Sequence, residues 1–379
     1  MFNKASISIM FVSIISSSIA VAKTELDTST LKEMKSLRSQ YKLPSLSVAV
    51  AIDDDIVFAQ AIGFSDINNS ELANAKTQYS VGSLAKPMTG LALANLVDSG
   101  KISLRRPVST YVKSPKYTTS FNVEELAAHI AGVPHDTPER DIAEFEVIKD
   151  HTSPSEAFYV FDKHPLLFSP GSEYRYSSNG YILLSAVIEK AAETNYVDFL
   201  KGSLWKTFKM NNTELDTSFA GLKNEATYYA DYNAEDKHIG SIKRRDRSFL
   251  FGGGGFISTP SDLVRMAKAT YSAKYLSDNA RGLLSTPVKM RNGKVNSDKY
   301  SLGWRVGKLK LSETDEQSWT ALHHGGVTDN ASTAYLLVIP QCRASIAFAT
   351  NYVPNKFWRI RGGMARILKS YIDSSTCSS

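Results

Sequence analysis

The stretch Ser45-Leu-Ser-Val-Ala-Val-Ala51 runs through seven residues without a charge and is the starting point for the fold. A second apolar run, residues 56–61, follows it, and Asp53-Asp54-Asp55 separates the two. Short runs of apolar and β-branched residues bounded by turn residues are typical of β-strands. The two runs therefore predict a β-hairpin.

The same pattern returns near the C-terminus. Residues 334–339 and 344–349 are apolar runs, and a turn at 340–343 lies between them. Residues 28–41, before the first hairpin, and residues 357–371, after the last strand, carry apolar side chains at helical spacing. The simplest packing pairs the terminal strands in one antiparallel sheet that the terminal helices cover.

The middle of the chain, from about residue 80 to residue 275, is mostly helical in pattern. The predicted fold class is therefore α/β in the α+β sense: an antiparallel sheet flanked by N- and C-terminal helices, plus a mostly helical lobe. We expect residues 23–79 and 280–379 to form the sheet lobe and residues 80–279 the helical lobe. Because binding sites favour the space between lobes, we expect the active site there.

The first 22 residues are typical of a cleavable signal peptide. Lys4 precedes an apolar stretch at about residues 7–21, which ends in Ala20-Val-Ala22. A membrane anchor is the alternative, but the stretch is shorter than the roughly 20 residues that cross a bilayer. We expect removal of residues 1–22 and a soluble, secreted or periplasmic protein without a stable membrane anchor.

Composition excludes several classes of function. The formal charge is +6 over 379 residues, and the basic residues are spread out, so no nucleic-acid partner is expected. No CxxC or HExxH motif occurs and the histidines lack zinc-ligand spacing, so we expect no metal and no cofactor. In an oxidising compartment the two cysteines, Cys342 and Cys377, permit one disulfide.

A Ser-x-x-Lys pair in a helix puts a hydroxyl and an amine on one face. A desolvated lysine there can accept the hydroxyl proton and so activate the serine as a nucleophile. The motif alone is weak, because the chain carries four copies: Ser29/Lys32, Ser39/Lys42, Ser83/Lys86 and Ser203/Lys206. The first two copies fit the solvated face of a helix, and the fourth lies among packing aromatic residues.

Ser83 differs from the other three serines by its context. Tyr79-Ser-Val-Gly82 leads into it and Pro87 follows Lys86, and proline is tolerated in the first turn of a helix. Ser83 is therefore expected at a helix N-terminus. The backbone N–H groups and dipole there can stabilise an oxyanion and keep a nearby lysine neutral.

The chain resembles the serine β-lactamase/penicillin-binding-protein superfamily in five segments that come in family order. The resemblance runs from about Leu43 to Asn351 and implies a β-lactamase/transpeptidase-like fold. The segments are Ser80-Val-Gly-Ser83-Leu-Ala-Lys86, Leu126-Ala-Ala-His129-Ile-Ala-Gly132-Val-Pro134, Phe168-Ser-Pro-Gly171 with Tyr176-Ser-Ser178-Asn-Gly-Tyr181, Phe251-Gly-Gly-Gly-Gly255-Phe-Ile-Ser-Thr259-Pro-Ser-Asp262, and His323-His-Gly-Gly326.

The resemblance implies a role for each matching residue. Ser83 and Lys86 match the nucleophile and its proton acceptor, and Tyr176 matches the tyrosine that shares the proton transfer. Gly326 matches the strand residue whose N–H completes the oxyanion hole. His323 matches the cation or donor opposite the nucleophile.

Two departures from the family pattern bear on the substrate. Ser178 stands where the family has Asn, and Asn179 lies one position out of phase. His324 and Gly326 stand where β-lactamases and carboxypeptidases have hydroxyls that hold a substrate carboxylate. We therefore expect a carboxylate to bind poorly. The pattern resembles the mitochondrial β-lactamase-like peptidases more than the drug-resistance enzymes.

The sequence thus predicts an exported serine hydrolase that forms an acyl-enzyme on a small-molecule or peptide substrate, with peptidase or esterase activity. A D-Ala-D-Ala carboxypeptidase or a weak class C-like β-lactamase is the enzymatic alternative. A non-catalytic binding or self-assembling scaffold is the second alternative, because the resembling mitochondrial members are known to form filaments. The sequence leaves the natural substrate and the oligomeric state open.

Overall fold

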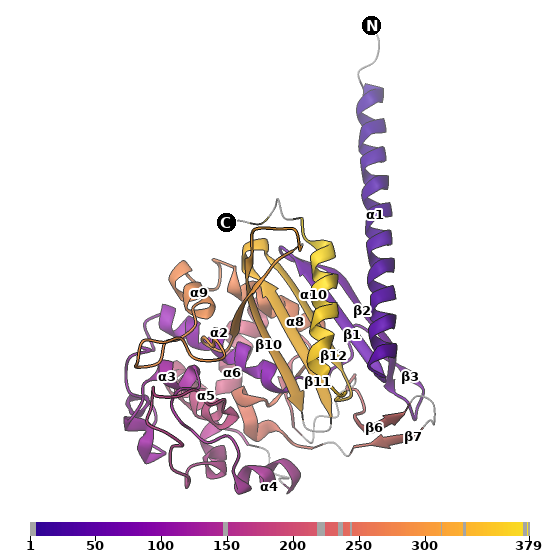
Figure 1. The fold of residues 1–379 in the computed structure, drawn as a ribbon. Coiled ribbons are helices and arrows are strands. Elements are labelled where there is room, and N and C mark those ends of the chain that lie inside the picture. The colour runs from indigo at the N-terminus through magenta and orange to yellow at the C-terminus, as the bar shows by residue number, and fades with distance from the viewer. Residues whose placement is uncertain are drawn as a thin grey trace.

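The computed structural model describes residues 5–146, 151–217, 224–233, 238–242, 245–311, 313–328, 331–373 and 377. In this part of the chain, seven strands form an antiparallel sheet in the order β3-β2-β1-β12-β11-β10-β9 (Figure 1). The strands are β1 (Ser45–Ile52), β2 (Asp55–Asp66), β3 (Glu71–Leu72), β9 (Arg305–Leu309), β10 (Trp319–Thr328), β11 (Ser332–Ile339) and β12 (Ala344–Thr350).

The two ends of the chain meet in the middle of this sheet. β1 pairs antiparallel with β12, with Val48 opposite Phe348. β1 and β2 form the predicted hairpin, and Asp53 takes the left-handed conformation in its turn, with φ of 52°. A short polar side chain tolerates this conformation better than most, which fits the aspartate-rich turn. The predicted fold class is confirmed.

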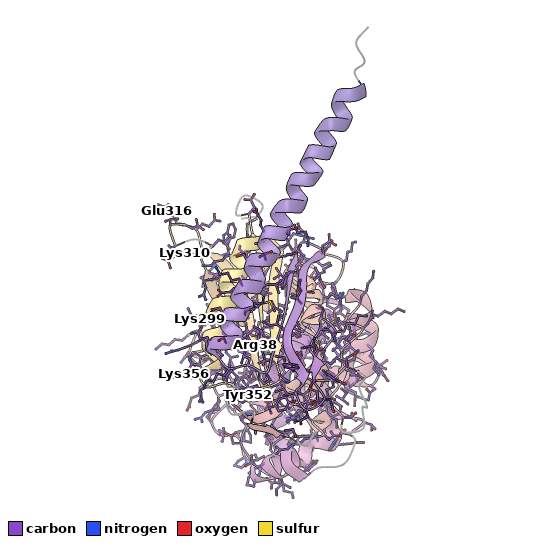
Figure 2. The ribbon with its side chains drawn as sticks, turned by 90° about the vertical axis from the view of Figure 1, so that its right-hand side faces the viewer. Arg38, Lys299, Lys310, Glu316, Tyr352 and Lys356 are labelled. Atoms are coloured by element: carbon purple, nitrogen blue, oxygen red, sulfur yellow. A yellow bond between two sulfur atoms is a disulfide. The ribbon has the colours of Figure 1, made fainter. Side chains whose placement is uncertain are left out.

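Two helices, α1 (Ala5–Gln40) and α10 (Ile360–Tyr371), cover one face of the sheet (Figure 1). Val48 and Val50 of β1 pack in this layer with Met34 of α1 and Met364 of α10. Figure 2 shows α1 crossing the sheet, with Arg38 near its C-terminal end. The Arg38 Nε and Nη2 groups donate to the Pro44 carbonyl at 3.3 and 3.2 Å, which ties the helix to the start of β1.

The opposite face of the sheet packs against α8 (Pro260–Ala267) and, through it, against the helical body. The period of two along β1 explains this division, because Ala49 and Ala51 point to α8 while Val48 and Val50 point to α1. Small alanines on this face let α8 lie close to β1 and β12. One continuous core therefore joins the sheet to the middle of the chain.

The helical body is built around α2 (Ala85–Asp98) and α5 (Ser178–Ala192). Residues 178–188 of α5 are all buried, as the apolar composition of this helix predicts. The remaining α-helices are α3 (Val123–Ala127), α4 (Pro138–Glu146), α6 (Tyr196–Leu200), α7 (Lys206–Phe208) and α9 (Asp278–Ser285). Two small sheets add β4 (Tyr79–Ser80), β8 (Phe256–Ser258) and β5 (Glu214–Leu215), and β6 (Tyr229–Asn233) with β7 (His238–Ser241).

Helix α1 is longer than the predicted helix at 28–41, because it reaches back to Ala5 and projects from the body (Figure 1). Residues 1–4 and the side chains of residues 5–22 lie outside the described part, so cleavage after Ala22 stays a prediction. None of the described helices has both the length and the apolar composition needed to span a bilayer. At the other end of the chain, the structure joins Cys342 and Cys377 in a disulfide.

Candidate active site

Ser83 lies in a short 3₁₀ turn, η1 (Gly82–Leu84), that leads directly into α2. Lys86 stands in the first turn of α2, and its Nζ lies 3.1 Å from Ser83 Oγ. Pro87 follows in the same turn, where its missing N–H leaves no helical hydrogen bond unmade. The structure thus brings the predicted serine and lysine within hydrogen-bonding distance of each other.

The Lys86 side chain is completely buried. Burial holds its pKa well below the usual range, and the positive charges of Arg140 and Arg305 lower the pKa further. The amine also contacts the Gly253 carbonyl at 2.5 Å and the Ser178 hydroxyl at 3.0 Å. A buried lysine with these partners can hold a neutral amine, which is the form that accepts a proton.

Gly253 belongs to the Gly-rich run at the end of η6 (Ser248–Gly253). A Cβ added at this position would lie 2.6 Å from the Ser178 carbonyl oxygen, closer than a real Cβ can approach. The absence of a side chain therefore lets the η6 backbone approach α5 and place a carbonyl on Lys86. The Gly-rich motif of the sequence is explained by this close approach.

Tyr176 lies over the same lysine. Its ring centroid is 4.6 Å from Lys86 Nζ, and its hydroxyl is a hydrogen-bond partner of Ser83. Burial raises the Tyr176 pKa to about 12 in spite of that hydrogen bond, so the hydroxyl keeps its proton at neutral pH. Behind the ring, the buried His129 imidazole lies with its centroid 4.5 Å away and holds the tyrosine in place.

The start of α5 determines whether Ser178 or Asn179 faces Lys86. Ser177 caps the helix by accepting the Gly180 N–H at 3.0 Å, and this fixes the phase of the next residues. Ser178 therefore points to Lys86, whereas Asn179 Nδ2 donates to the carbonyls of Pro134 and His135 at 3.0 and 3.1 Å. Ser178 thus lies beside the Lys86 amine, at the position where the family motif has an asparagine. Asn179 instead holds the loop at Pro134 and His135.

Strand β10 forms the opposite wall, and its residues alternate between two environments. His323, Gly325 and Val327 are half-buried and face the space in front of Ser83. His324 and Gly326 are buried behind them. A Cβ on Gly326 would lie 1.9 Å from the Val81 carbonyl oxygen, so this glycine lets the strand pack against η1.

Val327, next to Gly326, has its backbone turned to the turn η1 that carries Ser83. Its carbonyl oxygen lies 2.7 Å from the place that a Cβ on Gly82 would take, so this edge of the strand faces η1. Within an extended strand the N–H and C=O of one residue point to the same edge, and those of the next residue point to the other. The Val327 N–H therefore faces η1, whereas the Gly326 N–H faces β11.

Neither histidine of β10 is a cation at neutral pH. Burial lowers the pKa of His323 to about 4, and it holds the pKa of His324 well below its usual range; in both cases the Arg305 charge adds to the effect. His324 Nε2 lies 3.0 Å from the Tyr300 hydroxyl and 3.2 Å from Arg305 Nη1, as expected for a neutral ring that accepts there. The positive charge at this wall belongs to Arg305, which lies opposite His323 in the register of β9 with β10.

Two cavities flank Ser83. The first, of about 410 Å³, is called the Arg305 pocket and is lined by residues that include Arg305, His323, Tyr335, Trp358 and Arg361. The second, of about 260 Å³, is called the Arg247 pocket and is lined by residues that include His135, Asp136, Arg140, Asp141, Arg247, Leu250 and Thr328. Ser83, Tyr176 and Val327 line both cavities. A substrate whose carbonyl lies at Ser83 can therefore extend one part into each cavity.

A larger hollow of about 990 Å³ lies elsewhere, between residues such as Tyr111 and Glu189. It does not include Ser83, and we do not place the chemistry there. Among the described residues, no cluster of His, Cys, Asp and Glu side chains is arranged to hold a metal ion.

The fourth Ser-x-x-Lys copy is arranged differently from the Ser83 copy. The Ser203 hydroxyl donates to the Phe199 carbonyl at 2.7 Å within its own helical segment. Lys206 is exposed, whereas Lys86 is completely buried. The burial of the lysine therefore distinguishes Ser83 from Ser203.

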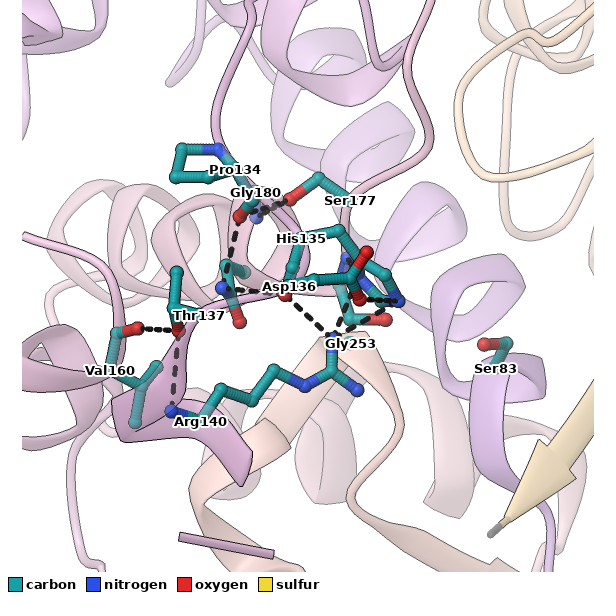
Figure 3. Close-up of polar contacts among 12 residues, drawn as sticks. Ser83, Pro134, His135, Asp136, Thr137, Arg140, Val160, Ser177, Gly180 and Gly253 are labelled. Carbon is teal, nitrogen blue, oxygen red and sulfur yellow. Dashed lines mark hydrogen bonds and ion pairs between the residues drawn. The ribbon is translucent and has the colours of Figure 1, made fainter. Parts of the chain in front are cut away.

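Sequence reasoning missed a histidine and arginine pair beside the nucleophile. His135 Nδ1 accepts the Ser178 N–H at 2.9 Å and lies 2.7 Å from Arg140 Nη1. Figure 3 shows the Arg140 guanidinium turned toward His135, with Ser83 on the neighbouring segment. Burial and the Arg140 and Lys86 charges lower the His135 pKa to about 3, so the ring stays neutral and its Nδ1 lone pair can accept the Ser178 N–H, with the Arg140 guanidinium beside it. A histidine three residues after Gly132 was the only available signal in the sequence.

The fold and this serine, lysine and tyrosine arrangement define a class of serine hydrolase. The family model described as Beta-lactamase matches residues 28–366, and the chain belongs to that family. Human mitochondrial serine beta-lactamase-like protein LACTB is 23% identical over 393 residues, which cover 80% of this chain and 70% of LACTB.

Solved structures of other hydrolases share the fold. The D-amino acid amidase from Ochrobactrum anthropi SV3 superposes with a TM-score of 0.74 at 17% identity, covering 91% of this chain and 98% of the amidase. EstCE1, described as a hydrolase with promiscuous acyltransferase activity, has a TM-score of 0.74 at 17% identity and covers 92% of this chain and 100% of its own. These likenesses establish the fold and not the substrate.

Proposed function

We propose that this protein is an exported serine hydrolase that cleaves an amide or ester bond through an acyl-enzyme on Ser83. One observation carries the proposal: the completely buried Lys86 amine lies 3.1 Å from Ser83 Oγ, with its pKa lowered by burial. An amine that is neutral at this distance can take the hydroxyl proton as the serine attacks.

The first half of the reaction forms the acyl-enzyme. Ser83 Oγ bonds to the substrate carbonyl carbon while its proton passes to Lys86. The backbone N–H groups of Ser83 and Val327 hold the oxyanion, so Val327 takes the role that the sequence motif assigned to Gly326. Tyr176, which keeps its proton at neutral pH, donates it to the leaving group and is reprotonated from Lys86.

Hydrolysis of the acyl-enzyme completes the cycle. A water molecule attacks the ester carbonyl while giving a proton to the Lys86 and Tyr176 pair, and the proton returns to Ser83 Oγ as the acid leaves. The fold of this chain is compatible with both amide and ester substrates, since structural neighbours include a D-amino acid amidase and EstCE1.

Active-site labelling tests the nucleophile. We expect a fluorophosphonate to add to the intact protein once, and peptide mapping to place the adduct on Ser83. Ser83→Ala should abolish labelling and turnover of an aryl ester without changing the melting temperature by more than a few degrees. The matched control is Ser203→Ala, which should label as wild type does; an adduct on Ser203 would contradict the proposal.

Export is tested separately at the N-terminus. We expect N-terminal sequencing of protein recovered from the periplasm to begin at Lys23, because Ala20-Val-Ala22 is the predicted cleavage site. Recovery of the chain only from the cytoplasm, with the first 22 residues intact, would contradict export.

A further inference from the structure

Arg247 stands immediately before η6 and lines the Arg247 pocket together with Ser83. Its backbone is fixed, because its N–H donates to the Asp216 carbonyl at 2.9 Å. A Cβ on Gly255 would lie 2.7 Å from the Arg247 carbonyl oxygen, which shows how closely the Gly-rich run packs against it. The side chain is only 6% exposed. Arg247 is therefore a buried cation beside the nucleophile.

The guanidinium of this residue has no partner among the described residues. No hydrogen bond or ion pair joins the Arg247 side chain to any of them. Asp216, whose carbonyl holds the Arg247 backbone, accepts a hydrogen bond from Ser80 Oγ at 2.6 Å on its carboxylate. The guanidinium nitrogens are not among the enclosed side-chain atoms that lack a hydrogen-bond partner, so they are accessible from the pocket, where an anionic ligand can pair with them.

Two other arginines of the site and its surroundings have carboxylate partners, whereas the half-buried Arg38 donates to the Pro44 carbonyl. Arg265 contacts Asp262 at 2.8 Å, and Arg305 contacts Asp298 at 3.2 Å. Arg247 thus differs from Arg265 and Arg305, because no carboxylate is paired with its guanidinium among the described residues.

The other groups in the pocket define the ligand's chemistry. Arg140 adds a second cation, while Asp136 and Asp141 are exposed at the mouth and disfavour a multiply charged anion. A volume of about 260 Å³, shared with the reacting carbonyl, leaves room for a chain of a few carbon atoms. A guanidinium matches a carboxylate in its planar, two-pronged geometry. A short chain that ends in one carboxylate fits all three conditions.

We propose that the Arg247 pocket binds a carboxylate carried by the substrate a few carbon atoms from the carbonyl that Ser83 attacks. This inference rests on the proposed function, because it names the substrate class of the same site. It makes Arg247 a specificity-determining residue. It also reverses the expectation from the β10 motif that the site has no partner for a carboxylate.

Matched esters test the proposal. In the acyl arm, 4-nitrophenyl monoesters of succinate, glutarate and adipate are compared with methyl-ended esters of equal chain length. In the leaving-group arm, 4-acetoxybenzoate is compared with 4-acetoxybenzamide. Rates obtained with Ser83→Ala are subtracted to remove spontaneous hydrolysis. Wild type should favour the acid in one arm, by about tenfold to hundredfold in kcat/KM.

Single-residue variants test whether Arg247 causes the preference for the acid over the neutral ester. Arg247→Gln should remove the preference while leaving kcat/KM for the neutral ester within a few fold, and Arg247→Lys should keep part of it. Arg361→Gln, which removes a cation from the other pocket, is the matched control and should keep all of it. The proposal is overturned if wild type shows no preference in either arm, if Arg247→Gln keeps it, or if Arg361→Gln loses it instead.

Binding without turnover separates this inference from the proposed function. Glutarate is titrated calorimetrically into Ser83→Ala protein, with and without Arg247→Gln. We expect binding that weakens by at least tenfold in the double variant. Equal binding by the two proteins, or no binding by either, overturns the inference. Failure of the proposed function appears differently, as ester turnover that persists in Ser83→Ala or is absent from wild type.

Discussion

The two pockets beside Ser83 each contain a conspicuous arginine, yet the two arginines are in opposite situations. Arg305 is held by Asp298 at 3.2 Å, contacts His324 at 3.2 Å and lies over the rings of Tyr176 and Tyr300. Arg247 is more deeply buried, and its guanidinium has no hydrogen bond or ion pair among the described residues. The Arg305 guanidinium already has a carboxylate partner and lines its pocket as a fixed group, whereas the Arg247 guanidinium is available to bind an anionic ligand.

The two pockets share one wall and differ in their outer residues, so the proposed reaction and the proposed substrate preference depend on different residues. Ser83, Tyr176 and Val327 line both pockets, and the buried Lys86 amine behind them contacts Ser83 and lies under the Tyr176 ring. The arginines line only one pocket each, Arg140 and Arg247 in the Arg247 pocket and Arg305 and Arg361 in the Arg305 pocket. Changes at the common wall should therefore affect all substrates alike, and changes at an arginine should affect only substrates that reach it.

The largest effect is expected at the common wall, from Gly326→Ala. Its Cβ would lie 1.9 Å from the Val81 carbonyl oxygen, so β10 must move away from η1 and from Ser83. We expect a loss of about a hundredfold or more in kcat/KM for acid and neutral esters alike, since misplacing an oxyanion donor costs that much. Gly325→Ala is the control, because the nearest atom to its Cβ is 3.9 Å away. Equal activity of the two variants would contradict the close packing of β10 on η1.

A smaller and one-sided effect is expected from Asp298→Asn, which removes the counter-charge of Arg305. The freed guanidinium should make the Arg305 pocket more receptive to anions. Acid substrates whose charge reaches that pocket should gain roughly threefold to tenfold in kcat/KM, the range for a charged partner at a half-exposed position. The Arg247-dependent preference should stay as it is. An equal gain for both kinds of acid ester would show that the pockets are not separate.

Hydrolysis of a β-lactam tests the effect of missing side-chain hydroxyls at the pocket-facing positions of β10. The pocket-facing positions Gly325 and Val327 carry none, so we expect nitrocefin to be hydrolysed more slowly than a simple aryl ester on the same preparation. Gly325→Thr adds a hydroxyl where space exists, and it should shift the ratio toward nitrocefin by about threefold to tenfold. Faster hydrolysis of nitrocefin than of the ester by wild type would put the β-lactamase alternative first.

The smallest effect is a shift of the pH profile. Because burial and two positive charges lower the Lys86 pKa, the neutral, active amine predominates above that lowered value, and the rate should rise with pH and then level off. Arg140→Gln removes one of these charges, so the Lys86 pKa should rise. The rising part of the rate-against-pH curve should then move to higher pH by about a few tenths of a unit. With chemistry rate-limiting, a flat wild-type profile from about pH 5 to 9 or a shift to lower pH would contradict this role.

The sequence predicted the parts of the molecule that depend on local pattern. The hairpin at residues 45–61, the terminal strands and the start of a helix just after Ser83 all follow from runs of apolar residues and the placement of a proline. The pairing of β1 with β12 could also be expected, because two apolar hairpins at opposite chain ends need each other's edges.

What the sequence could not provide depends on strand phase and on long-range approach. The β10 motif leaves open which residues face the pocket, and only the packing of Gly326 on Val81 turns Val327 to Ser83. Similarly, Ser178 and Asn179 were distinguishable only through the cap at Ser177. Arg247 and Arg305 carry no motif role, so their position beside the nucleophile becomes visible only when β9, η6 and α2 are assembled.

The contact between η1 and β10 also determines when the protein can first react. Ser83 is synthesised early and the β10 backbone late, so a nascent or proteolytically clipped chain that ends before β10 carries its Ser-x-x-Lys pair without the Val327 N–H. The nucleophile in such a fragment has no complete oxyanion hole and should not acylate indiscriminately. Under the proposed mechanism, the pair of oxyanion donors is therefore complete only in a molecule whose β10 has packed against η1.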